Sequence, residues 1–136
     1  MANTEFQVNT YTDNFQEHPS ISNLSNGGFV VTWVSKGQDG DGTGIFGQLY
    51  DSSGNASGSE FGVNTYTEYG QWSPSVANLF DGNFVVTWTT NDGGTSNIFS
   101  QIFDSSGNAS GTEFQVNTYT YGYQNDSSVT GLFDGG

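Results

Sequence analysis

Short apolar and β-branched runs recur along the chain, separated by turns rich in glycine, asparagine and aspartate. In residues 84–88 the first, third and fifth side chains (Phe84, Val86 and Trp88) share one face of an extended strand, and the two between them share the other. Both faces are apolar or β-branched, which is typical of a strand covered on two sides. No segment has a helical period, so the pattern predicts an all-β protein.

The run Phe-Val-Val-Thr-Trp occurs twice, beginning at Phe29 and again 55 positions later at Phe84. Its surroundings repeat as well. An opening segment Glu-Phe-x-Val-Asn-Thr-Tyr-Thr begins at Glu5, Glu60 and Glu113, at spacings of 55 and 53. Self-similarity at such a period predicts a repeat architecture.

We interpret residues 1–136 as a single repeat domain with two complete units, 5–59 and 60–112, and a truncated one, 113–136. Each complete unit contains four short apolar runs, which we expect to form a four-stranded meander. A unit of this size cannot bury its own faces, so neighbouring meanders should stack. Radial stacking would give β-propeller-like blades, and the alternative is a β-sandwich of the same hairpins.

Particular positions in the repeat have structural predictions attached. Gly27 and Gly82 lie in Asn-Gly and Asp-Gly turns between apolar runs, where a hairpin requires positive φ. Trp33 and Trp88 recur inside strands, and we expect both to be buried anchors of the core.

The two ends of the array are expected to be unpaired. Residues 5–12 should form a strand with no earlier strand in the chain to pair with, and residues 132–136 should lack their hairpin partner. Open strand edges template pairing with another chain, so we expect self-association through the unpaired terminal strands. The first five residues carry no signal-peptide pattern, so we expect the sequence to be part of a longer parent.

The charge balance excludes some partners. Asp and Glu number 14 against a single basic residue, Lys36, and the net charge is −13. Such a chain cannot neutralise a phosphate backbone, so nucleic acid is excluded, and anionic membranes are disfavoured. No apolar run approaches the roughly 20 residues of a membrane span, so we expect no membrane insertion.

Acidic loops are candidates for a cation. Asp39 and Asp41 alternate with glycine, and Asp92 lies in the corresponding loop of the second unit. Oxygen ligands on a glycine-rich loop suit Ca²⁺, whereas the alternative is a solvated loop. Asp51 and Asp104 recur in Asp-Ser-Ser-Gly-Asn turns, where we expect each carboxylate to cap its own turn.

Aromatic residues gather between the units and are candidate ligand-binding residues, because an aromatic face beside amide and carboxylate groups suits a sugar ring. The alternative role is packing between units. The candidates are Tyr66, Tyr69, Trp72, Tyr119, Tyr121 and Tyr123.

Catalysis finds no support in the sequence. His18 and Lys36 each occur once, and no nucleophile or metalloprotease motif is present. Glu5, Glu60 and Glu113 could serve a glycosidase, but residues that recur in every unit are expected to be structural.

The repeat resembles a unit of large secreted bacterial proteins, namely hemolysin-type (RTX-like) calcium-binding and adhesin-like proteins. The similarity lies in the segments 74–77, 81–88, 39–51 and 113–118. It implies an extracellular or cell-surface array, a propeller-like fold, and adhesive or calcium-associated roles.

Our leading expectation is therefore a non-catalytic extracellular binding or adhesive module, with a glycan or cell-surface ligand and possible Ca²⁺. The first alternative is a purely structural, self-assembling array or filament subunit. A more distant alternative is a glycoside hydrolase.

Overall fold

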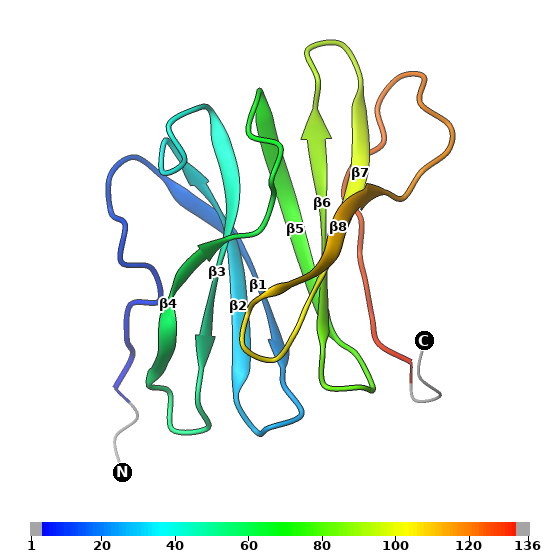
Figure 1. Ribbon diagram of the computed structural model, residues 1–136. Helices are drawn as coiled ribbons and strands as arrows, with labels where there is room; N and C mark the ends of the chain where they lie inside the picture. The colour runs from blue at the N-terminus through cyan, green and yellow to red at the C-terminus, as the bar shows by residue number, and fades with distance from the viewer. Residues whose placement is uncertain (1–3, 133–136) are drawn as a thin grey trace.

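The computed structural model describes residues 4–132, and these residues form an all-β fold without a helix (Figure 1). The strands are β1 (Gln16–Asn23), β2 (Phe29–Lys36), β3 (Thr43–Tyr50), β4 (Ala56–Gly62), β5 (Gly70–Asn78), β6 (Phe84–Asn91), β7 (Ser96–Phe103) and β8 (Ala109–Gln115).

The strands form two antiparallel meanders with the same internal order, β1 to β4 and β5 to β8. A parallel bridge between Thr43 and Gly70 joins β3 to β5, which makes one open eight-stranded sheet. The corresponding positions of the second meander, Ser96 and Tyr123, form the same parallel bridge. The predicted all-β class and tandem four-stranded meanders are confirmed, whereas the β-propeller-like arrangement and its alternative, a β-sandwich, both stay predictions.

The meanders are offset from the sequence units. β4 spans Ala56–Gly62 and pairs with β3, so the segment that opens the second sequence unit begins inside the last strand of the first meander. Each meander therefore ends on an opening segment, and residues 5–12 stand where the last strand of a preceding meander would lie.

The hairpins between β1 and β2 and between β5 and β6 use the predicted glycines. Gly27 has φ of 84° and Gly82 has φ of 89°. In the first hairpin, Gly27 N–H donates to the Leu24 carbonyl at 3.0 Å, which closes a tight turn before the glycine continues into β2. The positive-φ prediction is confirmed at both positions.

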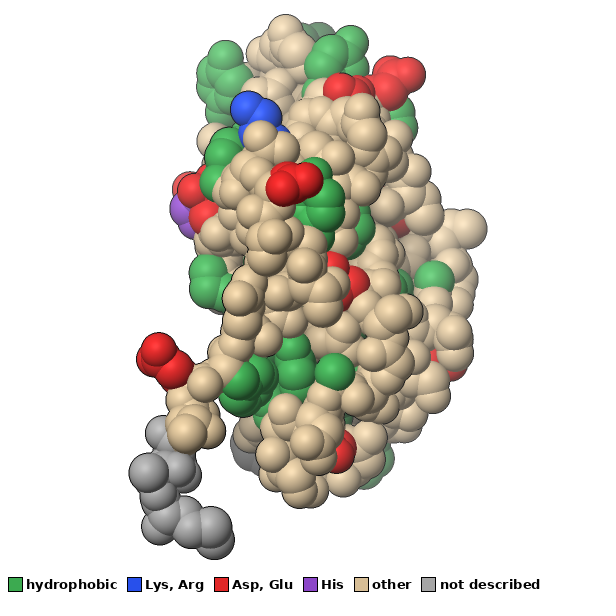
Figure 2. Space-filling model, turned by 90° about the vertical axis from the view of Figure 1, so that its left-hand side faces the viewer, with side chains coloured by type: hydrophobic (Ala, Val, Ile, Leu, Met, Phe, Trp, Pro, Cys, Tyr) green, Lys and Arg blue, Asp and Glu red, His purple; other side chains and the backbone are tan. Residues whose placement is uncertain are grey.

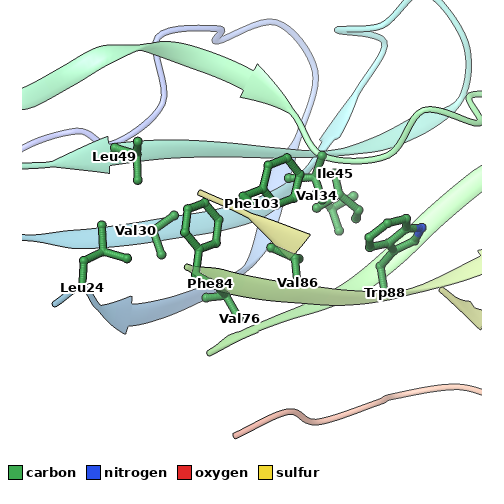
Figure 3. Packing of buried hydrophobic residues seen from close by; sticks show 11 residues of the cluster. Leu24, Val30, Val34, Ile45, Leu49, Val76, Phe84, Val86, Trp88 and Phe103 are labelled. Carbon is green, nitrogen blue, oxygen red and sulfur yellow. The ribbon is translucent and has the colours of Figure 1, made fainter. Parts of the chain in front are cut away.

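The main core lies between the two meanders (Figure 3). Val30 and Val34 of β2 face β6, which contributes Phe84, Val86 and Trp88. The first meander therefore contributes the valine face of β2 to this core, and the second contributes the aromatic face of β6. The same Phe-Val-Val-Thr-Trp pattern can do both because each of its two faces is apolar.

The aromatic face of the first meander forms a smaller cluster. Trp33 packs there with Val31 and Tyr50, and Val8 from the N-terminal segment lies against them. Trp33 and Trp88 are both buried, which confirms the core prediction, although they belong to different clusters.

Serine side chains attach each meander to the next. Ser20 Oγ of β1 accepts the backbone N–H of Val76 of β5 at 3.2 Å. Ser75 Oγ of β5 accepts the N–H of Val129 at 3.2 Å. The C-terminal segment thus lies over β5 in the way that β5 lies over β1.

The prediction of a strand at residues 5–12 is wrong. The segment has no strand hydrogen bonding, and no described strand lies beside it in the place that β3 has beside β4. It instead runs along the outer side of the first meander, at the blue end of the ribbon in Figure 1. Of the predicted open hairpin at 132–136, all but Leu132 lies outside the described residues.

The recurring glutamates connect successive opening segments. Glu113 Oε2 accepts the backbone N–H of Thr65 at 2.6 Å, and Glu60 Oε1 accepts that of Thr10. A carboxylate that accepts a backbone N–H satisfies a donor that no strand ladder pairs. The structural role expected for these glutamates is confirmed at Glu60 and Glu113.

Candidate functional site

The topology separates the two ends of the molecule. Successive strands run in opposite directions, so the four tight turns lie at one end and the loops of residues 37–42, 63–69, 92–95 and 116–122 lie at the other (Figure 1). The acidic and aromatic candidates from the sequence fall mainly on these loops, and we call this the loop end.

A hollow at the loop end lies between the two meanders and has a volume of about 430 Å³. Phe15, Tyr69 and Trp72 line it together with Lys36, Asp41 and Asn91. We call this the aromatic hollow. Its size falls within the range of small-molecule sites in proteins.

Phe15 and Trp72 form the aromatic floor of the hollow. Their rings are stacked with centroids 6.2 Å apart and planes at 20°. Lys36 Nζ lies 5.3 Å from the centroid of Phe15, within cation–π range. In Figure 2 the single basic side chain stands beside hydrophobic side chains near the upper end of the face.

Close backbone contacts fix the wall that carries Tyr69 and Trp72. A Cβ on Gly70 would lie 2.6 Å from Trp72 Nε1 and 2.9 Å from Thr43 Oγ1, so only glycine admits the indole here. Tyr69 has φ of 63°, which turns the chain sharply before β5 and leaves its ring half exposed. The equivalent residues Asn14 and Gly122 also have positive φ, 59° and 75°, so this sharp turn belongs to the repeat.

Two side-chain amides, one half-buried and one buried, hold the loop between β4 and β5. Asn64 Nδ2 donates to the carbonyl of Tyr66 at 2.9 Å and to Gln71 Oε1 at 3.2 Å. Gln71 Nε2 donates to the Glu68 carbonyl at 3.0 Å, and its side chain is completely buried. These hydrogen bonds fix the backbone of the loop that carries Tyr69.

The structure divides the predicted aromatic residues among different places. Tyr69 and Trp72 meet in the aromatic hollow, whereas Tyr66 lines a separate hollow with Asp92. Tyr66 donates to Glu68 Oε2 at 3.2 Å, and desolvation followed by this bond raises its pKa. The remaining tyrosines do not share the aromatic hollow.

Those remaining tyrosines lie on the C-terminal side. Tyr119 and Tyr121 are exposed, with ring centroids 5.9 Å apart. Tyr123 lines the hollow between the second meander and the C-terminal segment, where Asn125 takes the place that Trp72 has in the aromatic hollow. Trp72 also lines this second hollow, but Phe15, the ring stacked on Trp72, lines the aromatic hollow.

The three predicted Ca²⁺ ligands are not brought together. Asp39 Oδ1 accepts the N–H of Asp41 within one loop, and Asp41 borders the aromatic hollow. Asp92 lies in the next loop, where both carboxylate oxygens accept the Thr95 hydroxyl at 2.9 and 3.0 Å. Among residues 4–132, no three His, Cys, Asp or Glu side chains are placed to share a metal ion. Ca²⁺ binding stays a prediction.

The aspartates at the opposite end cap their turns as predicted. Asp51 Oδ1 accepts the N–H groups of Ser53 and Asn55, each at 2.9 Å. Asp104 makes the same bonds in the second meander. Bonds to the Asn55 side chain and then its backbone lower the pKa of Asp51 below its ordinary value, and Asn108 does the same for Asp104.

The sequence did not indicate Phe15, Lys36 or Asn91 as site residues. Lys36 and Asn91 occupy equivalent ends of β2 and β6, but their side chains differ, so the repeat gives no signal for either. Phe15 precedes Gln16 as Gly70 precedes Gln71, which hides the ring in an otherwise repeated pattern. The one feature of the sequence that could have drawn attention to Lys36 is that it is the single basic residue in an acidic chain.

Comparison of the chain with protein-family models, curated proteins and solved structures gave no match. Residues 4–132 contain no helix of the length and apolar character needed to cross a membrane. Function is therefore argued from the geometry of the site.

Proposed function

We propose that the chain is a non-catalytic, extracellular binding module whose aromatic hollow holds a neutral carbohydrate. The observation that carries the proposal is the meeting of Phe15, Trp72 and Tyr69 with three polar side chains between the two meanders. An adhesive role would follow if several such binding units, repeated along a secreted protein, bound carbohydrate on a surface.

The hollow offers both kinds of contact that a sugar makes, an aromatic face for the ring and polar groups for the hydroxyls. The apolar face of a pyranose ring packs against an exposed aromatic face, here offered by Tyr69 beside Trp72. Sugar hydroxyls need donors and acceptors at the rim. Lys36 supplies a donor, Asp41 an acceptor and Asn91 both.

Charge supports a neutral ligand over an anionic one. The chain carries a net charge of −13, so an anionic ligand approaches against a repulsive field. Lys36 is the chain's only basic side chain, and Asp41 lies on the same hollow. One ammonium beside one carboxylate does not form an anion site.

The test is a glycan array followed by calorimetry on the best ligand. We expect Tyr69→Asn and Asp41→Asn each to weaken binding at least about tenfold, which corresponds to ~1.4 kcal/mol. Asparagine tolerates the positive φ of position 69, so the first change removes the ring without straining the loop. Tyr121→Asn, a highly exposed tyrosine outside the aromatic hollow, is the matched control.

The array is repeated with Ca²⁺ and with a chelator, because the loop of Asp39 and Asp41 borders the hollow. Binding that needs Ca²⁺ would support a calcium-associated site. A ligand whose affinity ignores Tyr69→Asn and Asp41→Asn, or an array without any ligand, would remove the carbohydrate proposal and leave the purely structural array.

A further inference from the structure

The last strand of the second meander exposes the residues that its counterpart buries. In β4 and just beyond it, Phe61 packs against the main core and Val63 is only 2% exposed. Their equivalents at the end of β8, Phe114 and Val116, are 48% and 51% exposed. The difference arises because a second meander covers β4, whereas no described segment covers the outer face of β8.

The surface that covers Phe61 is a stacked aromatic pair. Phe84 and Phe103 lie with centroids 5.3 Å apart at 13°, and Phe61 meets Phe103 at 5.5 Å and 51°. The first meander has the same pair on its outer face, since Phe29 and Tyr50 lie 5.0 Å apart at 12°. A receptor for a strand like β8 therefore exists at the other end of the molecule.

The N-terminal segment occupies that receptor. Phe6 meets Tyr50 at 5.4 Å and 50°, which reproduces the geometry of Phe61 on Phe103. Residues 5–12 and residues 113–120 are identical in sequence, Glu-Phe-Gln-Val-Asn-Thr-Tyr-Thr. The segment that caps the receptor and the strand that lacks a cover are therefore chemically interchangeable.

The cap is weaker than the strand that could replace it. Residues 5–12 form no strand, and a hollow of about 280 Å³ remains between this segment and Trp33. The corresponding tryptophan, Trp88, lies inside the main core. An intact meander ending in β8 would bring a paired strand and a second layer of side chains to the same face.

We propose that a second copy of this chain docks head to tail, with β8 of one copy replacing residues 5–12 on the first meander of the next. In the docked pair, Phe114 and Val116 take the places of Phe6 and Val8. β1 of the next copy then lies over β5 of the first copy in place of the first copy's residues 124–132, and Ser75 Oγ of β5 accepts a backbone N–H of that β1 as it accepts that of Val129.

The glutamate contacts extend in the same register. Glu60 holds the backbone N–H of Thr10, and Glu113 holds that of Thr65. Thr118 is the next equivalent position. Once Thr10 of the next copy is displaced, Glu60 of that copy is free to accept the backbone N–H of Thr118 from the first copy. Such an interface is heterologous, so it produces a ring if the rotation closes and a filament if it does not.

The test is sedimentation velocity of the full chain over a range of concentrations, at low and high salt. We expect reversible, concentration-dependent association that salt promotes, because each copy carries a charge of −13. Phe114→Ser with Val116→Ser should reduce the association constant at least about tenfold, because burial of these side chains drives docking.

The opposite change separates this arrangement from a symmetric pairing of two β8 strands. Phe6→Ser with Val8→Ser loosens the cap but leaves β8 intact, so it should raise the association constant. Phe80→Ser is the matched control, since Phe80 is 75% exposed in the turn between β5 and β6, at a distance in sequence from both end segments. Thermal melts of every variant confirm that each chain is folded.

Three results would overturn the proposal. The first is that the wild-type chain and the Phe6→Ser, Val8→Ser variant both stay monomeric. The second is that the Phe114→Ser, Val116→Ser variant associates as strongly as the wild type. The third is that the Phe6→Ser, Val8→Ser variant associates no more strongly than the Phe80→Ser control.

Discussion

Trp88 donates its indole N–H to the hydroxyl of Thr90 at 3.2 Å, two residues along the same strand and inside the core. The first meander lacks this bond. Trp33 Nε1 and Ser35 Oγ occupy the equivalent positions, and neither has a hydrogen-bond partner among the described residues. The same two positions of the repeat, two residues apart, thus form a hydrogen-bonded pair in one meander and an unbonded pair in the other.

This contrast predicts opposite outcomes for two matched substitutions. Thr90→Ala strands the Trp88 indole N–H in the core and should cost ~1–3 kcal/mol of unfolding free energy. Ser35→Ala removes a hydroxyl that makes no bond and should be near neutral or stabilising. Urea unfolding of both variants measures the difference. Equal losses would mean that Ser35 is bonded in solution, for instance through a buried water.

A second prediction concerns Gly82, whose φ is 89° and whose added Cβ would meet nothing within 4 Å. Gly82→Val should therefore cost ~1–3 kcal/mol through backbone strain alone. Gly62→Ala is the control, because Gly62 also has open space around it and no positive φ. If the two variants unfold at the same denaturant concentration, the turn does not require a left-handed residue.

The three tryptophans should report their burial separately. Trp33 and Trp88 are buried and Trp72 is partly exposed at the aromatic hollow, so acrylamide should quench mainly Trp72. Trp88→Ala should cost ~3–5 kcal/mol. Trp33→Ala should cost less, since a hollow already lies beside that ring. Quenching that persists at full strength in a Trp72→Phe variant would contradict the assignment.

The sequence predicted what repeats locally. The alternation in residues 84–88 identified a strand with two covered faces, and the Asp-Gly and Asn-Gly turns identified Gly27 and Gly82. These features depend on the pleat and on φ preferences, which act over a few residues. The expected turn caps at Asp51 and Asp104 are of the same kind.

The sequence could not predict contacts that join distant residues. Phe15 stacks on Trp72 across the junction of the two meanders, and nothing in either local pattern indicates the other. The strand expected at residues 5–12 failed for a related reason. Strand formation needs a partner, and the same eight residues are partly strand at β8, where β7 pairs with them, and coil at the N-terminus. Pairing outweighs local preference here.

The capped turns predict a specific response to acid. Bonds made by Asn55 lower the folded pKa of Asp51 below its ordinary value of 3.8, and Asn108 does the same for Asp104. A carboxylate with a lowered folded pKa stabilises the fold above its unfolded pKa, and this contribution disappears as pH falls through the folded value.

Both aspartates should therefore titrate below pH 3.8 when followed by carboxyl carbon NMR. Asp51→Asn with Asp104→Asn should reduce the dependence of stability on pH below about 4, the ordinary range for Asp. A folded pKa at or above the ordinary value would show that the turn bonds are absent in solution.

The last prediction follows from the charge of the whole chain. Fourteen carboxylates and one ammonium give −13, and in residues 4–132 no lysine or arginine side chain lies within salt-bridge distance of a carboxylate. Folding brings the carboxylates closer together without neutralising them, so repulsion should lower stability most at low ionic strength. Raising NaCl from about 0.01 to 0.15 M shortens the Debye length from ~30 to ~8 Å and should raise the melting temperature.

The melts are run at a concentration where the chain is monomeric, so that association does not contribute. Sodium sulfate stabilises most proteins by surface exclusion, so NaCl is the informative salt. A melting temperature that does not change with NaCl would show that the unfolded chain feels the same repulsion as the folded one.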